Sequence, residues 1–334
     1  MLFSKKSLGI DLGTSYTRIY LPKEGLVVNE PTVVAVSIED RKVVAVGNDA
    51  KDMIGKVPDN IVAKRPLKSG VIASYKMTQS LLEHFIKKSL GRSRFVRPDV
   101  MISVPAGITT VEERAVIEAA VSAGAGKVHL IPEPLAAAIG AGLPINTSSG
   151  NMIVNLGGGT TEVAVISMNG IVTFNSARVG GDDINTSIAN WLRRNHNLLI
   201  GEQMAEQAKI TIGTAMETEQ FTEMEISGRD ISEGMPRSLT INSNELVGAI
   251  RPVVDQMISA IKKVLEKTPP ELSSDVIDRG MVLTGGTANL RLIDDLLTKA
   301  TGVAAVTVDD PMFCVAKGTS EAIKHIDLIK RSLR

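Results

Sequence analysis

Short apolar runs that alternate with polar residues follow one another along almost the whole chain. Residues 8–12 form such a run, the tip Gly13-Thr14-Ser15 interrupts it, and residues 17–21 alternate again, so the pattern predicts a β-hairpin with a glycine-rich tip. The same order of strand, glycine-rich tip and strand recurs over residues 153–166. Because the two hairpins are about one domain length apart, they indicate two related halves rather than a short repeat.

Helical periodicity accounts for most of the sequence between the predicted strands. Thr110 and Glu113 have the spacing of a capping box, which predicts a helix that runs from there toward Gly124. Apolar faces with helical spacing occur in three further segments: 81–86, 184–192 and 253–265. Strands that alternate with helices predict an α/β protein with largely buried sheets.

Composition narrows the class of protein. The 334 residues include 43% hydrophobic and 22% charged side chains, which suffices for two globular domains and excludes a disordered chain. Lysine plus arginine and aspartate plus glutamate both number 37, so no overall positive charge attracts the protein to nucleic acid. The single cysteine, Cys314, is expected to be a small buried thiol. Without a signal sequence or a long apolar segment, we expect a cytoplasmic protein.

The two hairpin tips carry groups that bind phosphate. Glycine lets backbone N–H groups approach a phosphate closely, hydroxyl side chains add donors, and Asp11 supplies a carboxylate for the hydration shell of magnesium. Neither tip is a Walker A loop or a dinucleotide-binding turn, because a strand follows each of them. One such tip is more often a plain hairpin turn, whereas two matching tips favour a phosphate site. A third turn, 285–287, predicts either a surface for a base or ribose, or a tight strand-to-helix connection.

Five segments resemble the superfamily of actin, Hsp70 and sugar-kinase ATPases, and within it the MreB family of bacterial actins: 10–14, 29–35, 45–51, 133–142 and 279–286. The resemblance implies the α/β actin-like ATPase fold, in which two duplicated α/β domains with four subdomains flank a cleft for ATP (or GTP) and Mg²⁺. It implies the subdomains IA (1–32, 67–145 and 313–334), IB (33–66), IIA (146–181 and 243–312) and IIB (182–242).

The same resemblance implies a function. MreB proteins form antiparallel double protofilaments on the inner face of the cell membrane, where they organise cell-wall synthesis and cell shape with the cell-wall elongation machinery and its membrane proteins. We therefore expect a nucleotide-dependent, membrane-associated polymer with ATPase activity. Its expected partners are further copies of itself, an anionic membrane surface and that machinery. Two alternatives stay open, a soluble chaperone- or kinase-type ATPase and a nucleotide-binding polymer with little turnover.

Position by position, the resemblance assigns roles to residues of the predicted cleft. Glu133 orients the water that attacks the terminal phosphate, Thr161 lies beside it, and Asp11 reaches magnesium through water. Without the resemblance, Glu133 is more simply a solvated carboxylate at a helix start, and Glu206 with Lys209 an ordinary surface ion pair. The residues expected to bind nucleotide are Gly13, Thr14, Ser15, Gly157, Gly158, Gly159, Thr160, Thr161, Glu206, Lys209, Gly285, Gly286 and Thr287.

Two positions depart from the family pattern. The second tip usually begins with aspartate, whereas Asn155 keeps an acceptor and loses the charge, so one of two carboxylates expected near magnesium is missing. Pro132 stands where family members often carry a second glutamate before Glu133. We expect nucleotide binding to survive on backbone contacts and hydrolysis to be slow.

Membrane attachment is predicted at two short apolar segments. Phe95 and Val96 lie among arginines in the segment 90–98, so their side chains can enter the acyl boundary while the arginines meet anionic headgroups. Leu2 and Phe3 precede two lysines and can add a second contact. An ordinary exposed loop before a buried strand explains the segment 90–98 equally well when the family resemblance is set aside.

Overall fold

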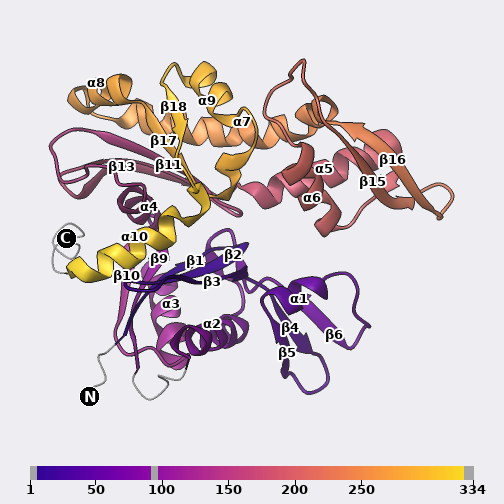
Figure 1. The fold of residues 1–334 in the computed structure, drawn as a ribbon, viewed down its shortest axis with the longest axis horizontal. Coiled ribbons are helices and arrows are strands. Elements are labelled where there is room, and N and C mark those ends of the chain that lie inside the picture. The colour runs from indigo at the N-terminus through magenta and orange to yellow at the C-terminus, as the bar shows by residue number, and fades with distance from the viewer. Residues whose placement is uncertain (1–5, 92–96, 327–334) are drawn as a thin grey trace.

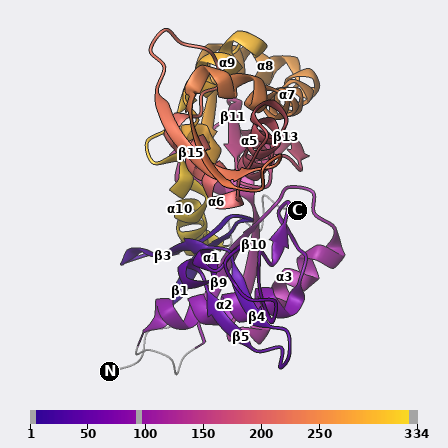
Figure 2. The same cartoon turned by 90° about the vertical axis from the view of Figure 1, so that its right-hand side faces the viewer.

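The computed structural model describes residues 6–91 and 97–326. Two α/β halves lie one above the other, and each carries a smaller sheet at the same end of the molecule (Figure 1). The view turned by 90° shows the same stacking (Figure 2).

The first half is built on a five-stranded sheet with the order β10-β9-β1-β2-β3. Strands β1 and β2 are the antiparallel hairpin predicted from the sequence, and β9 lies parallel to β1. A three-stranded sheet, β5-β4-β6, extends from this half. Its elements are β1 (Ser7–Leu12), β2 (Tyr16–Leu21), β3 (Gly25–Pro31), β4 (Val34–Ser37), β5 (Val43–Val46), α1 (Asn48–Asp52), β6 (Ile61–Lys64), β7 (Leu67–Lys68), β8 (Val71–Ile72), α2 (Tyr75–Leu90), β9 (Asp99–Val104), α3 (Thr110–Ser122) and β10 (Val128–Pro132).

The second half repeats this plan with the order β18-β17-β11-β12-β13. Strands β11 and β12 form the second antiparallel hairpin, and β17 lies parallel to β11 as β9 does to β1, which confirms the predicted duplication. A three-stranded sheet, β14-β15-β16, extends from it. Its elements are β11 (Asn151–Leu156), β12 (Thr161–Ser167), β13 (Gly170–Ala177), α5 (Gly181–His196), β14 (Leu198–Leu199), α6 (Glu202–Ile212), β15 (Glu223–Asp230), β16 (Pro236–Asn242), α7 (Ser243–Lys267), α8 (Pro270–Arg279), β17 (Met281–Thr284), α9 (Ile293–Thr301) and β18 (Ala305–Thr307).

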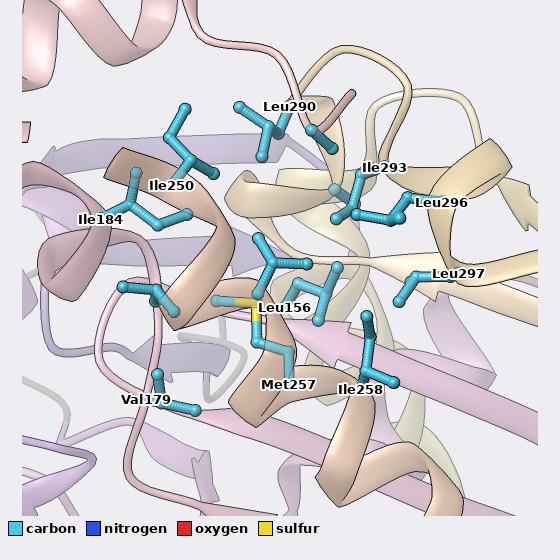
Figure 3. Packing of buried hydrophobic residues seen from close by; sticks show 14 of the residues in the cluster. Leu156, Val179, Ile184, Ile250, Met257, Ile258, Leu290, Ile293, Leu296 and Leu297 are labelled. Carbon is cyan, nitrogen blue, oxygen red and sulfur yellow. The ribbon is translucent and has the colours of Figure 1, made fainter. Parts of the chain in front are cut away.

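Each half has its own apolar core. In the second half the buried face of α7 packs with side chains of the sheet and of α5 and α9, including Leu156, Ile184, Met257 and Leu297 (Figure 3). The apolar face predicted over 253–265 therefore lies inside a longer helix, which ends at Lys267 before the two prolines.

Two helices join the halves. α4 (Glu133–Gly140) and α10 (Cys314–Ala322) pack against each other, and a third apolar cluster connects them with both large sheets. A Cβ on Gly318 would lie 1.8 Å from the carbonyl oxygen of Ala136, so the helices can approach this closely only where a side chain is missing. Cys314 begins α10 and is buried, as predicted, and burial raises the pKa of its thiol to about 11.

One sequence prediction was wrong by a residue. The capping box at the start of α3 is formed by Thr109 and Glu112, not by Thr110 and Glu113. Thr109 is extended and its hydroxyl oxygen accepts from the Glu112 backbone N–H, which leaves Thr110 as the first helical residue. The subdomain bounds stay a prediction.

Candidate functional site

A cavity of about 540 Å³ lies between the two halves, where the two hairpin tips, the start of α5, α6 and the turn at 285–287 meet. This volume is in the range of small-molecule sites. The structure brings to this cavity every predicted binding or catalytic residue except Thr161: Asp11, Gly13, Thr14, Ser15, Glu133, Asn155, Gly157, Gly158, Gly159, Thr160, Glu206, Lys209, Gly285, Gly286 and Thr287. Thr161 does not line the cavity. It is fully buried, and its hydroxyl donates to the carbonyl oxygen of Val179 at 2.8 Å.

The two hairpin tips lie in contact with each other and line the cavity. A Cβ on Gly158 would lie 1.8 Å from Ser15 Oγ, and one on Gly159 would lie 2.6 Å from Thr14 Oγ1. Glycine is therefore required where the tips approach each other. Ser15 Oγ donates to Asp182 Oδ2 at 2.7 Å, which links the first tip to the start of α5.

The acidic end of the cavity holds Asp11, Glu133 and Asn155, all buried. Asn155 Nδ2 donates to Glu133 Oε2 at 3.4 Å, and Asn155 Oδ1 accepts from Thr284 Oγ1 at 3.4 Å. Glu133 is the first residue of α4, yet it is not a solvated carboxylate. Burial, and then the charges of Glu162 and Asp11, raise the pKa of Glu133 well above its usual value.

Glu206 and Lys209 lie on α6 and line the cavity. Glu206 Oε2 forms an ion pair with Lys51 Nζ at 2.6 Å, and Lys51 comes from the small sheet region of the other half. Lys209 Nζ donates to the carbonyl oxygen of Gly181 at 3.0 Å, and burial lowers the pKa of its ammonium. Glu206 and Lys209 therefore each bind a different partner, and they are not an ordinary surface ion pair with each other.

Three residues of this region were missed by the sequence analysis. Arg18 lines the cavity and forms an ion pair with Asp11, and its place could have been found from the hairpin register, in which the two residues are opposite. Asp182 follows the glycine pair at the start of α5. Glu162 lies fully buried in β12 and accepts from the backbone N–H of Ala106 in the other half, and burial raises its pKa to about 7.

Magnesium fits these side chains poorly. Asp11 Oδ2 lies 3.4 Å from Arg18 Nη1, so the one predicted metal carboxylate already has a cationic partner. Asn155, the other position, has its amide nitrogen directed at Glu133. Mg²⁺ favours oxygen ligands and keeps most of its waters, and the two predicted metal positions, Asp11 and Asn155, offer it a single carboxylate that is shared with Arg18.

The fold and the cavity define an actin-like protein: two duplicated α/β halves with a cleft between them, and glycine-rich hairpins on both walls. A solved structure of MreB5 from Spiroplasma citri bound to ADP is similar with a TM-score of 0.92 and 32% identity, over 97% of each chain. A MamK double helical filament, at 20% identity, shares the fold with a TM-score of 0.78 over 96% of this chain and 99% of that one.

The sequence comparisons specify the family. The family model described as MreB/Mbl protein matches residues 5–331. The cell shape-determining protein MreB of Escherichia coli strain K12 is 50% identical over 328 residues, which span 96% of this chain and 94% of that protein. The chain belongs to the MreB/Mbl family.

The four residues predicted to contact membrane, Leu2, Phe3, Phe95 and Val96, lie outside the described residues. Within residues 6–91 and 97–326, no helix combines the length and the apolar character that crossing a bilayer requires.

Proposed function

We propose that the chain binds ATP, or another purine nucleoside triphosphate, in the cavity between its halves. The observation that carries this proposal is that glycine-rich tips from both halves lie in contact and line one cavity, where their backbones can approach a phosphate closely. The bound ADP of the Spiroplasma citri relative supports it. Glu206, Lys209 and the turn at 285–287 would then contact the ribose and base.

The proposed reaction is slow hydrolysis of the terminal phosphate. Glu133 would orient the attacking water, since it is a buried carboxylate that lines the cavity. Thr161 would have no direct role in the reaction, because its hydroxyl donates to the carbonyl oxygen of Val179. Asn155 keeps the rate low by leaving out a charge near the phosphates. Phosphate release by Asn155→Asp should be faster than by the wild type, and an equal or slower rate would remove this argument.

We further propose that the nucleotide controls assembly into antiparallel double protofilaments that organise cell-wall synthesis and cell shape. The shape-determining MreB of Escherichia coli and the MamK filament support this. The filament would lie on the inner face of the cell membrane, held by Leu2, Phe3, Phe95 and Val96, and recruit the cell-wall elongation machinery. These contacts rest on the sequence pattern.

Electron microscopy of the full chain with ATP and anionic vesicles tests assembly. We expect paired filaments on the lipid surface with nucleotide and fewer without it. Dispersed monomers at micromolar protein would instead favour a soluble ATPase of the same superfamily. Vesicle co-sedimentation of a Phe95→Ser/Val96→Ser variant tests the membrane contact, which undiminished binding would contradict.

A further inference from the structure

Arg18 stands out because a guanidinium is placed in the acidic end of the cavity. It lies on β2 directly opposite Asp11 of β1, and its Nη1 is 3.4 Å from Asp11 Oδ2. Only 13% of its side chain is exposed, and it lines the same cavity as Glu133 and Asn155. Arg18 Nε is buried and finds no hydrogen-bond partner among the residues that the structure describes.

The surroundings hold this guanidinium in place without satisfying it. Its central carbon lies 5.3 Å from the centre of the Tyr16 ring and 5.6 Å from that of the Phe313 ring, so aromatic side chains restrict its movement. An arginine has five N–H donors, and within the described part of the chain this one forms a single hydrogen bond, to Asp11. A buried donor without a partner is costly, which makes an oxygen-rich anion a favourable neighbour.

Two features change the charge of this end of the cavity in the same direction. Asn155 carries no charge and its amide is directed at Glu133, and Arg18 compensates the charge of Asp11. Both features weaken the attraction for a divalent cation and strengthen the attraction for phosphate oxygens. The hairpin register explains the contact with Asp11 and the place of Arg18 beside it in the cavity wall, but a structural ion pair leaves the unpartnered Nε without an explanation.

We propose that Arg18 binds the phosphates of the nucleotide and takes over part of the role that a divalent cation would otherwise have, so that nucleotide binding depends only weakly on Mg²⁺. This inference rests on the proposed nucleotide site. Arg18 remains against Asp11 and offers its other N–H groups to phosphate oxygens, in the planar arrangement that suits them.

The test is isothermal titration calorimetry of the full chain with ADP, in excess Mg²⁺ and in EDTA. The variants are Arg18→Leu, which removes the charge, and Arg18→Lys, which keeps it. Arg178→Leu is the matched control, because Arg178 is largely exposed and its ion pair with Glu112 is long, at 4.0 Å. Thermal unfolding of each variant reports whether it folds.

For the wild type, we expect the dissociation constant to rise by no more than about threefold when EDTA replaces Mg²⁺, because the guanidinium stays in place. Arg18→Leu should lose about tenfold or more in EDTA, as expected for a lost hydrogen bond to a charged group, and regain most of it in Mg²⁺. Arg18→Lys should lie between the two, and Arg178→Leu should match the wild type.

The experiment distinguishes failure of the Arg18 inference from failure of the proposed nucleotide site. Wild-type binding that occurs in Mg²⁺ and disappears in EDTA overturns the inference about Arg18, while the proposed nucleotide site is retained. An equal loss for Arg18→Leu in Mg²⁺ and in EDTA also overturns it, because a purely structural role has that signature. Absence of binding in both conditions overturns the proposed function and this inference together. If Arg18→Leu does not fold, the wild type and Arg18→Lys still decide the question.

Discussion

Gly159→Ala should separate the two hairpin tips and weaken nucleotide binding. An added Cβ would lie 2.6 Å from Thr14 Oγ1 and 2.8 Å from Thr14 Cβ. Rotation of the threonine side chain can move Oγ1 but not Cβ, so the backbone of one tip has to shift. Restoring an ordinary contact of about 3.4 Å requires a displacement of roughly 0.6 Å, and such overpacking typically costs about 1–3 kcal/mol.

The cost should appear mainly in ligand affinity, because the halves can relieve the clash by opening at the cavity. If opening has to be reversed when nucleotide binds, 1.4 kcal/mol corresponds to about a tenfold higher dissociation constant for ADP. Calorimetry of the full chain measures it, with Gly248→Ala as the matched control. Gly248 lies in α7 outside the cavity lining, and a Cβ there meets no atom within 4 Å. An unchanged affinity in Gly159→Ala would show that the contact between the tips does not matter for binding.

Three further perturbations probe the rest of the molecule. Burial raises the pKa of Glu162 from an ordinary 4.5 to about 7, so the folded state favours its neutral form and the free energy of unfolding should fall as pH rises from 4.5 to about 7. The thermal midpoint should fall less over this range in Glu162→Gln than in the wild type. Equal pH dependence of the two midpoints would contradict this. Lys51→Ala removes the 2.6 Å ion pair with Glu206, a half-buried interaction that should contribute about 1 kcal/mol. Nucleotide release should then be several-fold faster in stopped-flow measurements, whereas Lys87→Ala, which removes an exposed ion pair, should leave the release rate unchanged. Gly318→Ala places a Cβ 1.8 Å from a carbonyl oxygen of α4 and should lower the free energy of unfolding by about 3 kcal/mol. Gly248→Ala, in α7 where a Cβ meets open space, should leave the free energy of unfolding unchanged or raise it by about 0.5–1 kcal/mol. Equal denaturation midpoints for the two variants would refute the close contact between α4 and α10.

The duplicated plan could be predicted because it depends on local patterns. Each hairpin carries its own alternation and its own glycine-rich tip, so the sequence alone indicated two matching units, and the family resemblance added the cleft between them. The start of α3 was displaced by one residue because Thr109 and Thr110 both offer a capping hydroxyl, and only the extended backbone of Thr109 decides between them.

Contacts between distant segments could not be predicted in this way. The pairing of Glu206 with Lys51 joins residues from different halves, and no periodicity reports it. The family resemblance likewise placed Thr161 beside Glu133 in the second tip, whereas in the structure its hydroxyl donates to the carbonyl oxygen of Val179. Arg18 was overlooked because its significance depends on which face of the hairpin borders the cavity.

A crystal structure of the full chain grown with saturating ADP tests the central claim most directly. We predict density for the two phosphates between Gly13-Thr14-Ser15 and Gly157-Gly158-Gly159, with the adenosine toward α6 and the turn at 285–287. An empty cavity at saturating nucleotide, or a nucleotide bound elsewhere on the chain, would contradict it.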